Sequence, residues 1–230
     1  MSMLLVPGFM LDADLWRDVV PGLADFHPIA YADLSRDTSI HDMAQRALAE
    51  APETFVLVGF SMGGYVAREI VRQAPNRVSA LVLVATSARG DTDLQRQRKA
   101  AITGQTNGSS FRGLSTTAVA SSLHPENTDR VDLIDRIKSM AQRLGGEVFR
   151  RQSLIDRHDE RASLAGIKCP CLVIAGEDDK LRTRTELEEL HHGIEGSEFT
   201  ILNKTGHMIP LEAPASLAAA IEKWLRIVEF

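Results

Sequence analysis

Short apolar runs alternate with amphipathic segments along most of the chain. Six runs are rich in β-branched and other apolar residues and are nearly continuous in hydrophobicity, as strands buried on both faces must be. They span residues 3–7, 28–33, 54–59, 78–86, 170–177 and 198–204. Helical spacing is found in between, at residues 14–23, 39–51, 63–74, 184–194 and 214–228. Alternating strands and helices predict a three-layer α/β/α fold with a mostly parallel, roughly six-stranded sheet.

One interval, residues 87–165, interrupts this rhythm. It contains no convincing strand but has charged amphipathic stretches at 94–102 and 131–144, which predict a helical insertion on top of the sheet. A Gly/Ser/Thr-rich stretch at 103–117 is expected to be a mobile loop or a solvated linker. The predicted organisation is therefore a core formed by residues 1–86 and 166–230, with the insertion between them.

The composition is that of an ordinary globular protein. The 230 residues are 44% hydrophobic and 25% charged, and the net charge of -5 without a basic run argues against a nucleic-acid partner. The N-terminus has no basic region and only a short apolar run, so we expect a cytoplasmic protein with no membrane partner. Cys169 and Cys171 are expected to be packed thiols, not metal ligands. A monomer and a homodimer are equally compatible with this composition.

The third apolar run ends in Gly59-Phe60-Ser61-Met62-Gly63, which matches the pattern G-x-S-x-G. A sharp turn from strand to helix needs small residues, because its backbone passes through strained dihedral angles. Such a turn projects the serine oxygen away from its own backbone. Ser61 is thus the predicted nucleophile, and the N–H of Met62 at the helix N-terminus is a predicted donor to a developing oxyanion.

A serine nucleophile needs a base and an acid, which in a parallel sheet should lie at the carboxyl ends of other strands. Of seven histidines, His207 alone follows a predicted strand end. The fifth run ends in GEDD, where Glu177, Asp178 and Asp179 are alternative carboxylates. After the first run, Gly8 lets the N–H of Phe9 turn toward the serine as a second oxyanion donor, although a simple tight turn explains it equally well.

Four motifs together resemble the α/β-hydrolase family, in the order nucleophile, acid, base: PG-x₇-W from Pro7, GFSMGG, G-x-x-D from Gly176, and GHMIPLEAP. The similarity covers the core on both sides of the insertion. It implies that Asp179 is the acid, with Asp178 as the fallback, and that residues 87–165 are the family's cap. Three departures stand out: Pro7 replaces the usual histidine, LSRDTSIHD replaces a common Gly-His-Gly loop, and the family's first hairpin is missing.

The implied activity is that of a serine hydrolase that cleaves a small-molecule carboxylic ester or lactone through an acyl-enzyme, with no cofactor and no metal. A carbon-carbon bond hydrolase, a thioesterase, a perhydrolase and a receptor-like module with a vestigial triad remain alternatives. No Gly-rich phosphate loop follows a strand, which argues against nucleotide binding. Four residues are predicted to contact the substrate: Phe60, Met208, Phe111 and Leu123.

The insertion differs in charge from the rest of the chain. Residues 87–165 contain 13 Lys/Arg against 10 Asp/Glu, whereas the whole chain carries -5. One interpretation is that a mildly basic cap over an acidic core favours anionic substrates. The alternative is that the charges simply lie on solvated helix faces.

Overall fold

The computed structural model describes residues 1–105 and 111–228. Its centre is a six-stranded sheet in the order β2-β1-β3-β4-β5-β6, and every neighbouring pair of strands is parallel. The strands are β1 (Met3–Val6), β2 (Ile29–Tyr31), β3 (Phe55–Phe60), β4 (Val78–Val84), β5 (Cys171–Gly176) and β6 (Glu198–Leu202). The predicted α/β fold with its parallel sheet is confirmed. Five strands fall within predicted runs, and β3 extends one residue beyond its run, to Phe60.

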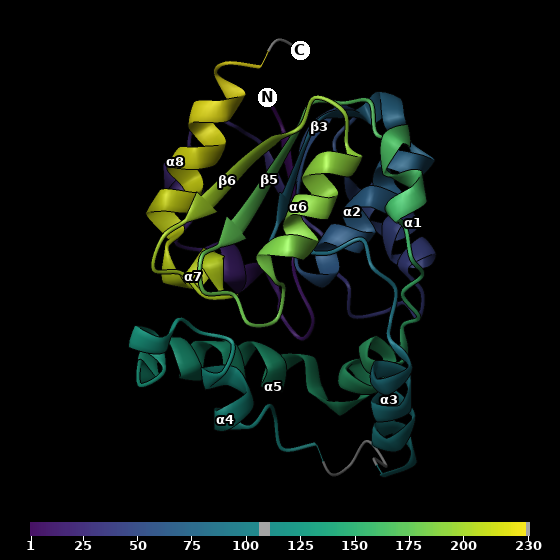
Figure 1. Cartoon of the computed structure of the whole chain (residues 1–230), viewed down its shortest axis with the longest axis vertical. Coiled ribbons are helices and arrows are strands. Elements are labelled where there is room, and N and C mark those ends of the chain that lie inside the picture. Colours follow the sequence, from purple (N-terminus) through teal and green to yellow (C-terminus); the bar gives the residue numbers. More distant parts are fainter. Residues whose placement is uncertain (106–110, 229–230) are drawn as a thin grey trace.

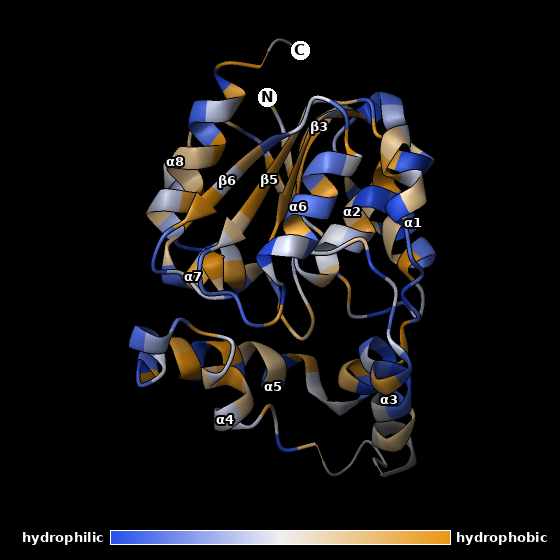
Figure 2. Ribbon diagram, in the orientation of Figure 1, coloured by the Kyte–Doolittle hydropathy of each residue, from blue (hydrophilic) through white to orange (hydrophobic). Residues whose placement is uncertain are grey.

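Alternate residues of the central strands enter two separate hydrophobic clusters, one on each face of the sheet. In β1, Leu4 and Val6 belong to one cluster, and Met3 and Leu5 belong to the other. All four side chains are buried, which explains why the run is continuously apolar in the sequence. Figure 2 shows the same property as hydrophobic colour along the strands and polar colour on the outer helices.

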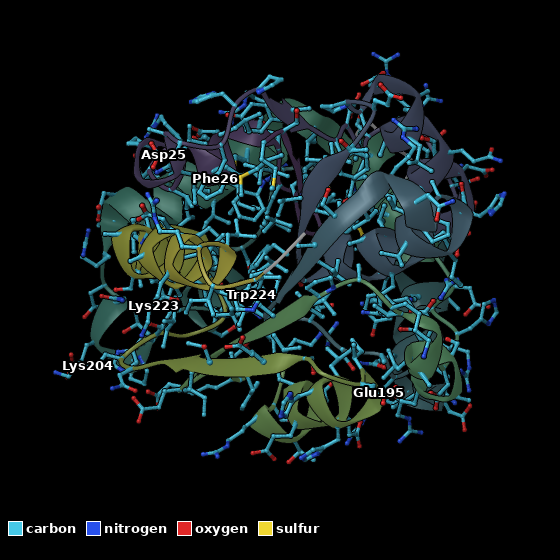
Figure 3. All side chains as sticks on the ribbon, turned by 90° about the horizontal axis from the view of Figure 1, so that it is seen from above. Asp25, Phe26, Glu195, Lys204, Lys223 and Trp224 are labelled. Atoms are coloured by element: carbon cyan, nitrogen blue, oxygen red, sulfur yellow. The ribbon has the colours of Figure 1, made fainter. Side chains whose placement is uncertain are left out.

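Helices cover both faces of the sheet (Figure 1). One face packs against α1 (Ile40–Glu50), α2 (Met62–Gln73) and α6 (Arg184–Gly193). The other packs against α8 (Pro214–Leu225) and the short turns η1 (Ala13–Trp16) and η2 (Val20–Leu23). Trp224 of α8 and Phe26 belong to this second cluster, and Figure 3 labels both beside α8. The remaining short elements are η3 (Pro75–Arg77), η6 (Arg161–Gly166) and α7 (Ile209–Glu212).

The helix predicted over residues 14–23 is wrong, because the chain forms only the two 3₁₀ turns η1 and η2 there. Pro21 has no N–H and Gly22 is a poor helix former, so a regular helix is disfavoured. Gly22 has a packing role in addition. A Cβ at this position would lie 2.6 Å from the Cβ of Ala218, so glycine allows α8 to approach closely.

The insertion is helical and lies across the carboxyl ends of the strands (Figure 1). It contains α3 (Asp93–Gln105), α4 (Thr116–Ala120), η5 (Pro125–Asn127) and α5 (Val131–Leu154). A backbone with φ 77° at Gly145 interrupts α5. The loop predicted at 103–117 is shorter than expected, because its first three residues end α3 and its last two begin α4. Residues 106–110 of that prediction lie outside the described residues.

Ion pairs fasten α5 to the segment that follows β1. Arg136 pairs with Asp14 and Asp18, and Arg143 pairs with Asp12 and Asp14. These two arginines of the basic insertion are therefore used to hold it to acidic residues of the core. Within the parts of the chain that the structure describes, none of the helices has the length and apolar character needed to span a membrane.

Candidate active site

Ser61 lies on the turn between β3 and α2 with a strained backbone, at φ 52° and ψ -113°. The turn is held from both sides. The Ser61 N–H donates to the Val84 carbonyl at 2.9 Å, and the Thr86 hydroxyl donates to the Ser61 carbonyl at 2.7 Å. Neither bond uses the Ser61 side chain, so its hydroxyl is left for other partners.

The glycines around Ser61 permit close packing at the elbow. A Cβ on Gly63 would collide with the carbonyl oxygens of Val6 and Pro7 at the end of β1. A Cβ on Gly59 would lie 2.6 Å from the carbonyl oxygen of Gly63. Only residues without side chains let α2 start directly against β1 and β3, which is the physical basis of the GFSMGG pattern.

The structure brings together three of the predicted residues in one hydrogen-bonded chain. His207 Nε2 lies 2.9 Å from Ser61 Oγ, and His207 Nδ1 lies 2.8 Å from Asp179 Oδ2. The second oxygen of Asp179, Oδ1, accepts the backbone N–H groups of Leu181 at 2.8 Å and Arg182 at 2.9 Å. The carboxylate is thereby fixed by three donors.

Burial strengthens these interactions. The side chain of Asp179 is 1% exposed and that of His207 is 7% exposed. Because a carboxylate accepts at Nδ1, that nitrogen carries the proton of a neutral imidazole, and Nε2 is free to accept the Ser61 hydroxyl proton. This arrangement can activate a serine as a nucleophile.

The two other carboxylates of GEDD have different partners. Asp178 Oδ2 pairs with His124 Nε2 at 3.1 Å, and Glu177 accepts the backbone N–H of Lys204 at 3.0 Å. The sequence left Glu177, Asp178 and Asp179 open as partners of His207, and in the structure the three side chains point to different groups. Asp179 is directed to His207, and Asp178 is directed to the insertion.

The two proposed oxyanion donors, the N–H groups of Phe9 and Met62, have no hydrogen-bond acceptor among residues 1–105 and 111–228. The Phe9 turn is closed by a bond from the Leu11 N–H to the Gly8 carbonyl at 3.3 Å. Met10 completes the turn with a positive φ of 55°. Both predicted donors are therefore free to bind a substrate oxygen.

The predicted substrate-contacting residues fall into two groups. Phe60, Leu123 and Met208 are buried in the cluster on the α8 face, and the Phe60 ring centroid lies 5.2 Å from that of His207. Phe111 is half-buried in the insertion, where its ring centroid is 5.0 Å from that of Phe149. Phe149 in turn makes an edge contact with Phe9, with 5.7 Å between the ring centroids. This contact connects Phe111 to the turn after β1 that carries the Phe9 N–H, which we call the oxyanion turn.

Sequence reasoning missed Gln152, which links the insertion to the oxyanion turn. Its Oε1 accepts the Met10 N–H at 2.8 Å, and its Nε2 donates to the Leu34 carbonyl at 3.0 Å. Gln152 is 2% exposed. A polar residue one turn after Val148 on the buried stripe of α5 was the available signal.

Glu212 was missed in the same way. It links the insertion to the loop after β6 that carries His207, which we call the base loop. It accepts N–H groups from Gly206 at 3.1 Å, from His124 at 2.6 Å and from the Asn127 amide at 2.9 Å. Beside it, the His207 N–H donates to the Ser122 carbonyl at 2.8 Å. The signal was its place in GHMIPLEAP, where a carboxylate stands among apolar residues.

No group of three or more His, Cys, Asp or Glu side chains among the described residues is arranged to hold a metal ion. Cys169 and Cys171 are not joined in a disulfide. Burial raises the pKa of the Cys169 thiol to about 11, so this thiol is not a competing nucleophile near neutral pH.

The family model described as "Alpha/beta hydrolase family" matches residues 3–220, and the chain belongs to this family. The pimeloyl-[acyl-carrier protein] methyl ester esterase of Edwardsiella ictaluri is 39% identical over 94 residues, which cover 37% of this chain and 36% of that protein. The same enzyme of Klebsiella pneumoniae (strain 342) is 37% identical over 93 residues, with the same coverage. The chain thus aligns with about a third of the length of these curated relatives.

Solved structures match over almost the whole chain. A malate-bound thermophilic esterase from Thermogutta terrifontis superimposes with a TM-score of 0.83 at 26% identity, covering 98% of this chain and 89% of that one. An enol-lactonase from Burkholderia xenovorans LB400 gives a TM-score of 0.85 at 19% identity, covering 98% and 91%. The second match shows the common fold alone.

Proposed function

We propose that the protein is a serine hydrolase that cleaves a small-molecule carboxylic ester or lactone through an acyl-enzyme. The observation that carries the proposal is the chain of hydrogen bonds from Ser61 through His207 to Asp179, with distances of 2.9 and 2.8 Å. The methyl ester esterases and the thermophilic esterase among the similar proteins support ester chemistry.

In the first half of the reaction, His207 Nε2 takes the Ser61 hydroxyl proton while the oxygen attacks the substrate carbonyl. Asp179 stabilises the imidazolium that forms. The negative charge on the carbonyl oxygen is stabilised by the N–H groups of Phe9 and Met62 and by the N-terminus of α2. His207 then returns its proton to the leaving alcohol, and the acyl group remains on Ser61.

The second half reverses these roles with water. His207 removes a proton from a water molecule, which attacks the acyl-enzyme, and the same N–H groups stabilise the second oxyanion. Release of the acid restores the Ser61 hydroxyl. Each proton is moved by His207 alone, so the reaction requires no redox step and no external base.

The test is covalent labelling with a fluorophosphonate probe, followed by intact-mass measurement and mapping of the labelled peptide. We expect stoichiometric labelling of Ser61 in the wild type, and none in His207→Ala. His158→Ala is the matched histidine control, because the His158 side chain is 84% exposed and, among residues 1–105 and 111–228, pairs with Asp156 alone. A folded wild type that resists the probe would contradict the proposal and favour a receptor-like module.

If Ser61 is labelled, unlabelled protein is then assayed with chain-matched esters, lactones and thioesters, and with a diketone that tests cleavage of a carbon-carbon bond. Among these we expect the ester or lactone to have the highest kcat/KM. The further expectations of a small-molecule substrate, a cytoplasmic location, a monomer or homodimer, and no nucleic-acid, membrane, metal or cofactor partner belong to the same proposal. The free thiols of Cys169 and Cys171 support a reducing compartment.

A further inference from the structure

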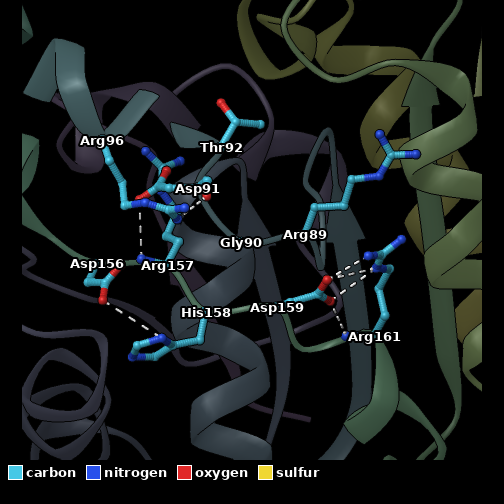
Figure 4. A pocket seen from close by; sticks show the side chains of 10 residues that line it. All are labelled: Arg89, Gly90, Asp91, Thr92, Arg96, Asp156, Arg157, His158, Asp159 and Arg161. Atoms are coloured by element: carbon cyan, nitrogen blue, oxygen red, sulfur yellow. Dashed lines mark hydrogen bonds and ion pairs between the residues drawn. The ribbon is translucent and has the colours of Figure 1, made fainter. Parts of the chain in front are cut away.

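A cavity of about 220 Å³ lies where the insertion joins the core, and its lining includes neither Ser61 nor His207. An adjoining cavity of about 400 Å³, drawn in Figure 4, shares five of its residues. The shared residues are Arg89, Gly90, Asp91, Thr92 and Arg157. The smaller cavity is completed by Tyr65, Gln95, Leu181, Arg182 and Glu186.

The acidic residues of the smaller cavity are already hydrogen-bonded to other groups. Asp91 pairs with Lys99 and also accepts the backbone N–H of Arg157 at 3.3 Å. Glu186 accepts the N–H of Thr183 at 2.8 Å and its hydroxyl at 3.1 Å, as part of the capping box of α6. These carboxylates have limited capacity to neutralise the arginines beside them.

Arg89 has a carboxylate partner of its own. Its guanidinium binds Glu189 through two hydrogen bonds, at 2.8 and 2.7 Å. Arg161 of the adjoining cavity is likewise paired with Asp159, as Figure 4 shows. Both arginines are thus neutralised in the way expected of a structural ion pair.

Arg157 and Arg182 differ from them. Arg157 contacts Asp91 only through Nε, at 3.4 Å, and among residues 1–105 and 111–228 nothing accepts a hydrogen bond from its guanidinium. Arg182 has no carboxylate partner in that part of the chain. Its Nη1 donates to the Leu181 carbonyl at 3.0 Å, and its Nε is buried without a hydrogen bond. Burial lowers the pKa of Arg157, Asp91 opposes this, and the positive charge of Arg182 lowers it further.

Two neighbouring guanidinium groups of this kind cost free energy unless a negative charge lies between them. Guanidinium groups bind carboxylate and phosphate groups with paired hydrogen bonds. We infer that Arg157 and Arg182 form a binding site for the carboxylate or phosphate group of a small molecule. The site goes beyond the proposed hydrolytic reaction and does not depend on it.

The position of the site connects it to the hydrolytic residues. The backbone N–H of Arg182 donates to Asp179, and Tyr65 follows Ser61 by one turn of α2. Arg157 lies in the returning connection from the insertion to the core, and its guanidinium is 5.7 Å from the Tyr65 ring. A bound anion is either the charged end of an ester substrate or a separate ligand at this junction.

The first experiment measures thermal unfolding at low ionic strength while inorganic phosphate or succinate is titrated. We expect a saturable rise in Tm of about 2 to 4 °C for the wild type. The rise should be lost in Arg157→Gln and Arg182→Gln and retained in Arg150→Gln. Arg150 is an exposed arginine of α5 outside this cavity, which makes it the matched control.

A structural role for Arg182 predicts a different result. If the side chain only supported the fold, Arg182→Gln would lower the Tm without added anion. If it belongs to an empty anion site, the same variant should unfold at the wild-type temperature or above, since one of two repelling charges is gone. Should Arg157→Gln fail to fold, Arg182→Gln carries the test alone.

The second experiment distinguishes the sources of the anion, using methyl hydrogen adipate and methyl hexanoate as chain-matched esters. A substrate-borne anion predicts that Arg157→Gln raises the KM for the adipate ester about 10-fold and leaves that for the hexanoate ester unchanged. If Arg157→Gln leaves the KM of both esters unchanged and the phosphate-dependent Tm rise is present in the wild type, the anion is a separate ligand. Absence of a saturable Tm rise with either anion overturns the site, whether or not the protein hydrolyses esters.

Discussion

The core and the insertion share one hydrophobic cluster, to which the insertion contributes residues such as Leu123, Ile137 and Met140, but they differ in their polar contacts. The central strands are joined by parallel hydrogen bonding and buried on both faces by apolar side chains. The insertion is fastened at two places beside the reacting groups by polar contacts, through Gln152 and Glu212. The candidate site residues thus lie on loops of the core, and two of these loops are hydrogen-bonded across to the insertion.

The two adjacent aspartates of GEDD repeat this contrast on a smaller scale. Asp179 pairs with His207, its side chain is 1% exposed, and the pair continues to Ser61. Asp178 pairs with His124 of the insertion, and its side chain is 41% exposed. Two successive residues therefore hold one carboxylate paired with His207 and one paired with the insertion, and burial distinguishes them.

The largest expected effect separates these two aspartates. Asp179→Asn should lower kcat about 10⁴-fold, because the amide no longer fixes the reactive tautomer of His207 or stabilises its cation. Asp178→Asn, the neighbouring control, should lower kcat less than about tenfold, since Asp178 pairs with His124 and not with His207. Steady-state hydrolysis of p-nitrophenyl butyrate measures both. Equal losses in the two variants would contradict the assignment.

Cutting the bond between the insertion and the base loop should have the next largest effect. Glu212→Ala removes the acceptor of three N–H donors, so we expect a loss of about 3 kcal/mol in the free energy of unfolding. The kcat should fall as well, because the backbone beside His207 is no longer held. Urea unfolding and initial rates test this, with Glu222→Ala on the exposed face of α8 as control. A change as small as that of the control would refute the linking role.

The contact at the oxyanion turn is expected to contribute somewhat less. Gln152→Leu leaves the Met10 N–H and the Leu34 carbonyl without a partner, which should cost about 2 kcal/mol of stability and slow fluorophosphonate labelling about tenfold. Gln152→Glu keeps the acceptor for Met10 and should recover most of the labelling rate. If both variants label at the wild-type rate, Gln152 does not position the turn.

The smallest effect is expected at the exposed ion pairs of α5. Arg143 is 51% exposed and pairs with Asp12 and Asp14, so Arg143→Ala should cost about 0.5 kcal/mol and the difference should vanish in 1 M salt. Arg136 is only 11% exposed and binds the same segment, so Arg136→Ala should cost more. Unfolding in urea at two salt concentrations compares the two. A larger loss of unfolding free energy in Arg143→Ala than in Arg136→Ala would show that burial does not determine how much these ion pairs contribute to stability.

Much of the architecture could be predicted from the sequence because it depends on local patterns. Each of the six strands coincides with a predicted apolar run to within one residue, since a strand buried on both faces has to be continuously apolar. The prediction failed at residues 14–23, where Pro21 and close packing against α8 replaced a helix by two short turns. There a tertiary contact and a backbone restriction overrode the helical spacing.

Some residues of the candidate site were likewise predictable from the sequence, and others required the structure. The turn at Ser61 was predictable, because only small residues permit its backbone and the pattern is contiguous. His207 was predictable from its position after the last strand. The residues alone left Glu177, Asp178 and Asp179 open, and the resemblance to a family selected Asp179. Direction is not a property of composition, so the geometry was needed to show that Asp179 is directed to His207 and Asp178 to His124.

By itself, the sequence determined the parallel sheet and the sharp turn from strand to helix at Ser61. These features arise from periodicity and from the conformational limits of glycine and proline, which act over a few residues. The tertiary structure alone decided that Gln152 and Glu212 support the two reactive loops and that Arg157 and Arg182 lie together. Contacts between segments so distant in the chain depend on how whole elements pack, so a local pattern can mark such a residue but does not specify its partner.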